Sequence, residues 1–284
     1  MSEQHASDDQ YCETAARRDD PDRWLVSLFA PDALRPRLAA LLAFSGELAR
    51  TREQVSQPML GEIRLQWWRE ALDGIYAGTP RAHPIVRALA AAIAAGRLPR
   101  EPFDRLIDAR TDDLYETPPA DIAALEAYAG ATSAGLNRLL LAALGVDEAR
   151  LVAAGEAIGM AWSLTGLARA AAAHAALRRI HLPADWMAEA GTDRDRALLA
   201  PQAAETRAVL RRLAERAAAH LDAARTLVPR LPREARAVLL LGRLVRLYLA
   251  RLHQVDFDLA DPRLEIATPR KQIALMIAAW RGRL

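Results

Sequence analysis

Hydrophobic positions along this chain recur with the spacing of α-helices from one end to the other. Residues 121–144 and residues 207–227 show the pattern clearly, because each segment places its leucines on one side of a helix. Valine, isoleucine and threonine nowhere alternate with polar residues over the length of a strand. Proline and glycine interrupt the pattern at intervals, as expected between helices. The sequence therefore predicts an all-α protein of about nine or ten helices.

The chain is expected to form one helical domain. Hydrophobic residues make up 52% of its 284 residues, and many of them are alanine, so a large helical core can form. No segment is long and flexible enough to link two domains, and no internal repeat is visible. The first residues are polar and we expect them to be partly disordered. The predicted organisation is a disordered segment of residues 1–20 followed by a domain of residues 21–284.

Charge and targeting features argue against several classes of protein. There are 38 Lys and Arg residues against 36 Asp and Glu residues, and no basic run interleaves with aromatic residues, so nucleic acid is not an expected partner. The single Cys12 excludes an internal disulfide and favours a reducing compartment. The polar start of the chain does not resemble a secretory signal, and no apolar run reaches the roughly 18 residues that a membrane span needs. We expect a cytoplasmic protein.

One segment in the second half of the chain carries a motif. Residues 161–183 read AWSLTGLARAAAAHAALRRIHLP. Without a gap, this segment resembles the motif A-x-Q-L-T-N-I-L-R-D-x-x-E-D-x-x-x-G-R-x-Y-L-P of the squalene/phytoene synthase family, with matches at Ala161, Leu164, Thr165, Arg169, Arg179, Leu182 and Pro183. The two aspartates of the D-x-x-x-D core of that motif correspond to Ala170 and His174.

Other segments resemble the same family in the same order. The run ALLAF at residues 40–44 is similar to A-L-Y-A-F, which leads in the family into C-R-x-x-D-D-x-x-D. The three aspartates of that continuation correspond to Ala49, Arg50 and Glu53. The run LPREPFDRLIDARTDDLYE, which begins at Leu98, is similar to L-P-x-x-x-F-x-x-L-I-x-G-x-x-x-D-L and places Asp113 on the family aspartate. The resemblance thus covers most of the chain.

The resemblance implies an all-α fold, a single isoprenoid-synthase-type helical bundle around a central cavity. Enzymes of this family join two prenyl diphosphates head to head, and Mg²⁺ held by the paired aspartates neutralises the leaving diphosphate. Aspartates four residues apart lie one turn apart on the same helix face, where both can reach the metal. Here the first motif keeps one carboxylate, Glu53, and the second keeps none. We therefore predict no catalytic residue, no metal site and no cofactor, with Mg²⁺ expected only if the protein is a transferase.

Five residues are candidates for lining the cavity or binding a diphosphate: Glu53, Arg64, Asp113, Arg169 and Arg179. Arginine forms bidentate contacts with phosphate, and family enzymes keep arginines where Arg169 and Arg179 lie. Salt bridges from these two arginines to Glu53, Asp113 or Glu156 are an equally good interpretation. Arg64 lies on a helix expected to line the cavity, although a solvated position is the more ordinary interpretation of it.

A different branch of the family fits the first half of the chain better. Residues 47–72, ELARTREQVSQPMLGEIRLQWWREAL, resemble the non-synthase branch related to mitochondrial assembly factors for respiratory complex I. The matches are the ELA motif and Gly61, Arg64, Gln66, Trp67 and Trp68. This resemblance implies a non-catalytic factor for the assembly or stability of a membrane respiratory complex. The candidate surface for a protein partner is Trp67 and Trp68. Adjacent residues point about 100° apart on a helix, so at most one of them fully faces the core, and core packing beside a partly exposed surface is the more ordinary interpretation.

The C-terminal segment, residues 269–284, is amphipathic. Ile273, Met276, Ile277, Trp280 and Leu284 share one face, and Arg270, Lys271, Arg281 and Arg283 supply positive charge. This pattern is typical of peripheral contact with the inner face of a membrane that contains anionic lipid. A last helix docked on the bundle through its apolar face is the alternative.

Two alternative functions remain open at the level of sequence. One is head-to-head condensation of prenyl diphosphates, as in phytoene or squalene synthases, which the overall match and the two arginines of residues 161–183 favour. The other is binding of an isoprenoid lipid, such as a quinone, in a cavity without metal. A long apolar cavity with no carboxylates at its mouth would favour lipid binding over transfer.

Overall fold

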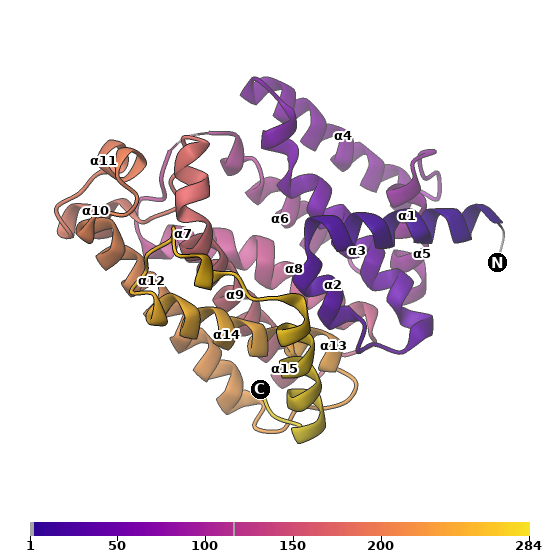
Figure 1. Cartoon of the computed structure of the whole chain (residues 1–284). Coiled ribbons are helices and arrows are strands. Elements are labelled where there is room, and N and C mark those ends of the chain that lie inside the picture. Colours follow the sequence, from indigo (N-terminus) through magenta and orange to yellow (C-terminus); the bar gives the residue numbers. More distant parts are fainter. Residues whose placement is uncertain (1–2, 116) are drawn as a thin grey trace.

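The protein is helical throughout the part of the chain that the computed structural model describes, residues 3–115 and 117–284 (Figure 1). The first eight α-helices are α1 (Glu3–Asp19), α2 (Pro21–Ser27), α3 (Arg35–Ala49), α4 (Pro58–Tyr76), α5 (Pro84–Gly96), α6 (Glu101–Ala109), α7 (Ile122–Ala129) and α8 (Gly135–Ala143). The others are α9 (Ala149–Ala176), α10 (Ala184–Glu189), α11 (Arg194–Leu199), α12 (Ala204–Leu227), α13 (Arg236–Leu239), α14 (Leu241–Gln254) and α15 (Thr268–Arg281).

Five short segments have other helical geometries. Four of them are 3₁₀ turns: η1 (Asp32–Leu34), η2 (Thr51–Gln54), η3 (Asp112–Leu114) and η5 (Pro262–Leu264). The fifth, η4 (Gly130–Ala134), is a π-helix that joins α7 directly to α8. The apolar stripe predicted for residues 121–144 is therefore one nearly continuous rod with a widened turn in its middle.

Helix α9 lies at the centre of the bundle. It packs along α12 over much of its length and also contacts α8, α14 and η4. Its apolar residues lie on all sides of the helix and not along one stripe, which is typical of a helix surrounded by others. Small residues allow the close approach, because Gly159 of α9 faces the backbone of Ala134 in η4.

Acidic side chains define where several helices begin. Asp20, Asp121 and Asp193 each accept a hydrogen bond from the backbone N–H three residues later, at the starts of α2, α7 and α11. This contact satisfies one of the backbone donors that a helix leaves unpaired at its first turn. Proline stands in the first turn of α4, α5 and α15, where its missing N–H costs nothing.

The prediction of a partly disordered segment at residues 1–20 is wrong for the described part of that segment. Residues 3–19 form α1, which packs on α3 and α5. Asp8, Cys12, Ala15 and Ala16 share one face and are buried, and Asp8 forms an ion pair of 2.6 Å with Arg87 of α5. The polar composition hid this stripe, because its members are small residues and one paired carboxylate rather than large apolar side chains.

One described helix, α9, is long and apolar enough to cross a membrane by length and composition alone. The sequence had predicted no such segment. Half of the apolar window of α9 is buried inside the protein, where other helices surround it. Its hydrophobicity therefore has a sufficient explanation in the packing of the bundle.

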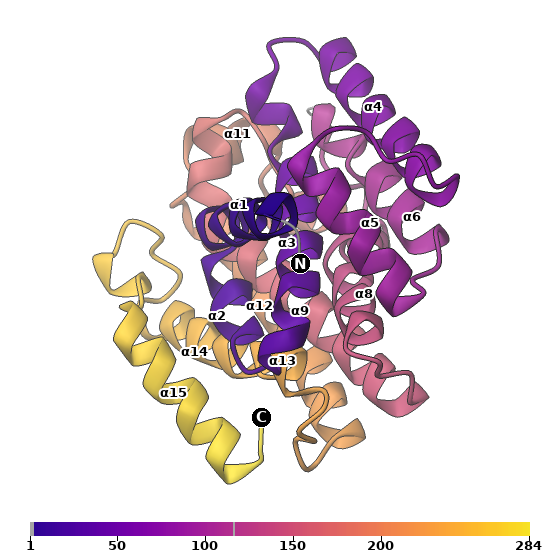
Figure 2. The same ribbon diagram turned by 90° about the vertical axis from the view of Figure 1, so that its right-hand side faces the viewer.

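Two helices lie at the edges of the bundle. Helix α4 runs along one margin, and α15 lies along the opposite margin beside α14, with the C-terminus at its far end (Figures 1 and 2). Each of them therefore has one side against the bundle and one side turned outward.

Candidate functional site

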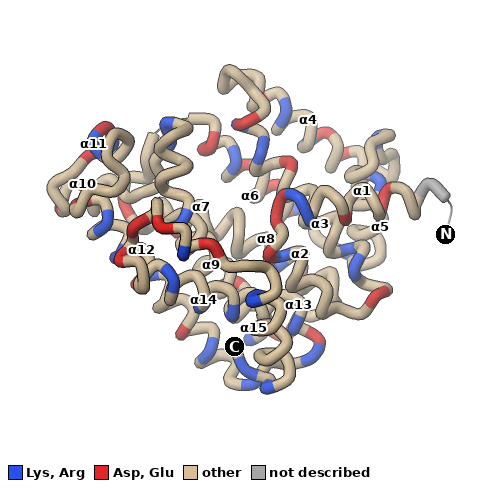
Figure 3. The backbone as a smooth tube through the Cα atoms, in the orientation of Figure 1, with Lys and Arg blue, Asp and Glu red and all other residues tan. Residues whose placement is uncertain are grey.

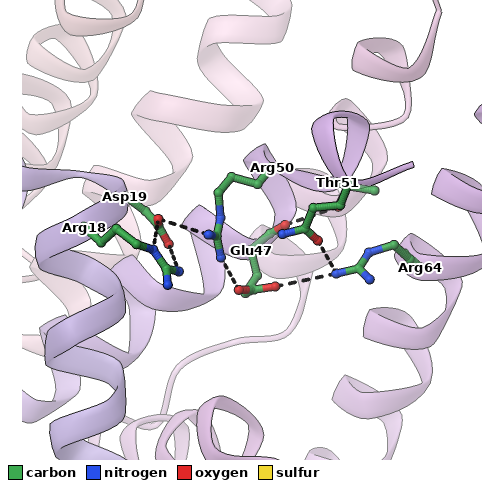
Figure 4. Close-up of polar contacts among 7 residues, drawn as sticks. Arg18, Asp19, Glu47, Arg50, Thr51 and Arg64 are labelled. Atoms are coloured by element: carbon green, nitrogen blue, oxygen red, sulfur yellow. Dashed lines mark hydrogen bonds and ion pairs between the residues drawn. The ribbon is translucent and has the colours of Figure 1, made fainter. Parts of the chain in front are cut away.

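The first motif region contains a chain of ion pairs where α3 ends (Figure 4). Arg50 forms an ion pair with Glu47, and its other nitrogen lies 3.3 Å from a carboxylate oxygen of Asp19 in α1. Asp19 also accepts hydrogen bonds of 2.7 and 2.9 Å from Arg18. Arg64 of α4 lies 3.7 Å from Glu47. Each of the two carboxylates in this network is thus held between two guanidinium groups.

This network does not fit the magnesium site that the family pattern implies. Ala49 has no ligand atom, Arg50 brings a cation, and the carboxylates nearest to it are already neutralised by arginines. Within residues 3–115 and 117–284, no group of three or more His, Cys, Asp or Glu side chains is placed to hold a metal ion. Mg²⁺ needs hard oxygen ligands whose negative charge is not already neutralised. Carboxylates that are paired with arginines do not supply such charge.

The second motif position lies on α9 and carries no carboxylate. Ala170 offers no ligand atom, and the ring of His174 packs against the ring of His181 with 4.8 Å between centroids. Burial, and then the neighbouring His181 and Arg179, lower the pKa of His174 to about 4. At neutral pH the imidazole of His174 is therefore uncharged.

A buried polar cluster lies next to these histidines. Arg110, at the end of α6, donates a hydrogen bond of 2.9 Å to Asp113 and one of 2.7 Å to the hydroxyl of Tyr128. That hydroxyl donates in turn to the other oxygen of Asp113 at 2.8 Å. Burial alone would raise the pKa of Asp113, but Arg110, His181 and Tyr128 together lower it to about 2. The carboxylate is therefore ionised at neutral pH.

A hollow of about 380 Å³ opens beside this cluster. Its lining includes Asp113, Tyr128, Arg179 and His181, together with apolar residues of α7 and of the segment before it. Arg179 also lies 3.9 Å from Glu53. The structure thus brings together three of the five predicted cavity residues, and the salt-bridge interpretation of Arg179 holds for its contact with Glu53.

The remaining two predicted residues lie elsewhere. Arg64 forms hydrogen-bonded and ionic contacts with Gln54 and Glu47 in the ion-pair chain of Figure 4. Arg169 stacks on the ring of Tyr248, with 3.4 Å from its guanidinium carbon to the ring centroid, and lines a separate hollow beside η5. Tyr248 is fixed by a hydrogen bond of 2.5 Å to Asp22. No acidic partner of Arg169 occurs among the described residues.

The predicted partner surface is wrong for one of its two tryptophans. Trp68 is 4% exposed and packs edge-on against Phe44 in the core, with 5.2 Å between ring centroids. Trp67 is partly buried and contacts Trp68 and Arg81. The outward side of α4 instead presents three large apolar residues, at 68, 45 and 60% exposure: Met59, Leu60 and Ile63. A hollow of about 540 Å³ on this side includes two of these residues and Trp67.

The sequence identified several residues of this site, but it did not identify the side chains that contact them. Arg110 stands three positions before Asp113 and could have been paired with it by spacing alone. The contacts of Tyr128 and His181 with Asp113 join three separate segments, so no local pattern points to them. Asp19, the partner of Arg50, lay in the segment that was expected to be disordered.

Comparisons with known proteins agree with this architecture. The model of the family described as squalene/phytoene synthase matches residues 16–270. The chain is 31% identical to "NADH dehydrogenase (ubiquinone) complex I, assembly factor 6" of Rattus norvegicus, covering 96% of this chain and 82% of that protein. It is 27% identical to the phytoene synthase of Rhodobacter capsulatus, covering 87% of this chain and 73% of that enzyme.

Solved structures share the fold. A dehydrosqualene synthase superimposes with a TM-score of 0.85 at 20% identity, over 98% of this chain and 97% of that chain. The prediction of an all-α bundle of the isoprenoid-synthase type is therefore confirmed. The family assignment rests on the sequence match across most of the chain together with a relative above 30% identity. This chain belongs to the squalene/phytoene synthase family.

Proposed function

We propose that this protein is a non-catalytic member of its family that helps to assemble or stabilise a membrane respiratory complex. The observation that carries the proposal is the ion-pair chain at the first motif, in which Arg50 and its neighbours neutralise Glu47 and Asp19. A catalytic centre of this family needs free carboxylates there to hold Mg²⁺ against a diphosphate. The similarity over nearly the whole chain to relatives that bear the name of complex I assembly factor 6 supports the same conclusion.

The outward side of α4 is the surface that fits a protein partner. Met59, Leu60 and Ile63 are exposed, and Ile63 and Trp67 contribute to one hollow with polar residues around it. Apolar anchors surrounded by a polar rim are typical of protein interfaces. This patch replaces Trp68, which the core covers, as the proposed site of contact.

Deletion of the gene in the source organism is expected to lower the amount of assembled respiratory complex I by several fold, measured on native gels and by NADH oxidation of isolated membranes. The wild-type gene should restore the complex. The double variant Met59→Ser/Ile63→Ser should restore it poorly, because truncating apolar anchors weakens a protein interface. The control Leu199→Ser changes an even more exposed apolar residue on α11, 87% exposed, and should restore the complex fully. An unchanged level of complex in the deletion strain would refute the assembly role.

Head-to-head prenyl transfer is the second candidate, favoured by the phytoene synthase relative and by Arg179 at the edge of the hollow beside Asp113. Titration calorimetry with farnesyl and geranylgeranyl diphosphates separates the two functions. The proposed function predicts no Mg²⁺-dependent binding, since Glu47 and Asp19 beside the first motif are paired with Arg50, and Glu53 lies 3.9 Å from Arg179. Binding that requires Mg²⁺ and is lost in Arg179→Gln would instead support transfer. Binding of an isoprenoid lipid or a quinone stays a prediction from the sequence, as does a cytoplasmic location.

A further inference from the structure

Helix α15 turns its large apolar residues outward. It docks on the bundle through a narrow face, where Ala274, Leu275 and Ala278 are buried. Four residues with helical spacing lie on the opposite side, at 54, 56, 42 and 85% exposure: Ile273, Met276, Ile277 and Trp280. The helix is therefore docked through a face other than the predicted apolar stripe, which stays uncovered except for Leu284. Contact of this segment with a membrane stays a prediction. A stripe of this kind marks an interaction surface.

A basic groove runs beside this stripe. It encloses about 1400 Å³ between the end of α12, the segment 228–234, the start of α14 and the end of α15. Its lining contains three carboxylates and seven arginines: Arg150, Arg225, Arg230, Arg243, Arg246, Arg281 and Arg283. Figure 3 shows basic positions gathered at this end of the molecule, around the C-terminus. The groove therefore has an excess of four positive charges.

Most of these arginines have no acidic side chain as a partner among the described residues. Arg150 pairs with Glu148, and Arg225 pairs with Asp222. In the part of the chain that the structure describes, the other five arginines of the groove form no ion pair with an acidic side chain: Arg230, Arg243, Arg246, Arg281 and Arg283. Arg246 donates a hydrogen bond of 3.3 Å to the backbone oxygen of Leu284. Arg243 is half-buried, and its burial, together with the nearby Arg246 and Arg281, lowers its pKa. Charges crowded in this way are stabilised by an anion from outside the chain.

The apolar stripe and the basic groove form one continuous surface. Ile277 belongs to the stripe and lines the groove, and Arg281 lies next to Trp280 at the end of the same helix. Figure 2 places α15 along the outer margin of the molecule, where a flat surface can approach it along its length. An amphipathic helix that lies in a bilayer interface combines these features: apolar side chains for the acyl boundary and basic ones for the headgroups.

We propose that α15 and the adjoining arginine groove form a docking surface for a bilayer that contains anionic phospholipid. A free phosphate or a nucleic acid would neutralise the arginines but leave the four apolar residues in water. A bilayer satisfies both halves of the surface at once, since lipid phosphates meet the groove while Trp280 and its neighbours enter the boundary below the headgroups. This docking does not depend on the proposed assembly role, although it would hold the protein beside a membrane complex.

Co-sedimentation of the full chain with vesicles tests the proposal. Vesicles of phosphatidylcholine with added phosphatidylglycerol are expected to bind the protein at low salt, and pure phosphatidylcholine vesicles are not. The double variant Arg281→Gln/Arg283→Gln should lower the partition coefficient about 30-fold, because each basic residue near an anionic surface contributes ~1 kcal/mol. The double variant Arg105→Gln/Arg196→Gln removes the same charge from arginines exposed elsewhere and should bind as the wild type does.

Fluorescence reports on the apolar half of the surface. Trp280→Phe keeps the apolar character, so this variant should still bind vesicles. The blue shift of tryptophan emission that vesicles cause in the wild type should be absent in this variant. Trp280→Ser should bind at least tenfold more weakly than the wild type, with an unchanged circular dichroism spectrum, since Trp280 makes few contacts within the protein. Two results would overturn the proposal: equal loss of binding in the Arg105/Arg196 control, or saturable calorimetric binding of inorganic phosphate without binding to vesicles.

Discussion

Asp113→Ala is expected to destabilise the protein by about 3–5 kcal/mol, the usual cost of removing one partner from a buried ion pair. Arg110 and Asp113 are only 16 and 12% exposed, so solvent screens their interaction little. Without the carboxylate, the guanidinium of Arg110 keeps only the hydroxyl of Tyr128 as a close partner. Urea unfolding followed by circular dichroism measures this loss as a lower midpoint with an unchanged slope.

The neighbouring aspartate provides a matched control for this prediction. Asp112 is exposed and forms no ion pair among the described residues, so Asp112→Ala should change the free energy of unfolding by less than about 0.5 kcal/mol. In an Arg110→Met background, the removal of Asp113 should cost much less than it does in the wild type, because no buried cation is left unpaired. Equal costs in the two backgrounds would mean that the Arg110 contact does not stabilise the fold.

Gly159→Ala is expected to destabilise the protein by about 3 kcal/mol, at the upper end of the cost of overpacking. A Cβ atom at this position would lie 2.5 Å from the Cα atom of Ala134 and 2.8 Å from the carbonyl oxygen of Ser133. These are backbone atoms and cannot rotate away, so α9 must shift from η4. That shift would also stretch the hydrogen bond of 2.7 Å that Ser133 donates to the carbonyl of Gly159. Thermal and urea unfolding both measure the effect.

At a second glycine of α9, the same substitution is expected to change the free energy of unfolding in the opposite direction. Apart from the backbone of its own helix and its chain neighbours, Gly166 has no atom within 4 Å of the place where a Cβ would stand. Gly166→Ala should therefore stabilise the protein by about 0.5–1 kcal/mol, because alanine loses less backbone entropy than glycine in a helix. If both glycine variants shifted stability in the same direction, the close packing of α9 on η4 would not be what distinguishes the two positions.

The two motif regions of the family differ in what replaces the metal-binding aspartates. At the first, the charges are paired within the protein: Arg50 and Arg18 both form ion pairs with Asp19. At the second, charge is lost, because Ala170 has no ionisable group and His174 is held neutral by burial. Neither arrangement supplies a cluster of unpaired carboxylates of the kind that Mg²⁺ binding favours.

The candidate site was predictable only in part. The motif alignment identified Asp113, Arg179 and Glu53, and these residues do converge. It could not find Tyr128 or His181, since their contacts with Asp113 come from other segments of the chain. The resemblance also could not say which tryptophan is buried, because the packing of Trp68 against Phe44 is a tertiary contact.

The sequence by itself determined the all-α class, the family and the single domain, because helical periodicity and ordered motifs are local properties of the chain. Only the tertiary structure decided which charges pair, that the N-terminal segment packs as α1, and which face of α15 stays in water. These outcomes depend on contacts between residues far apart in the chain, and periodicity does not say which side of a helix its neighbours will cover. The face with Ala274, Leu275 and Ala278 docks α15 on the bundle, and the larger apolar face with Trp280 is left outside.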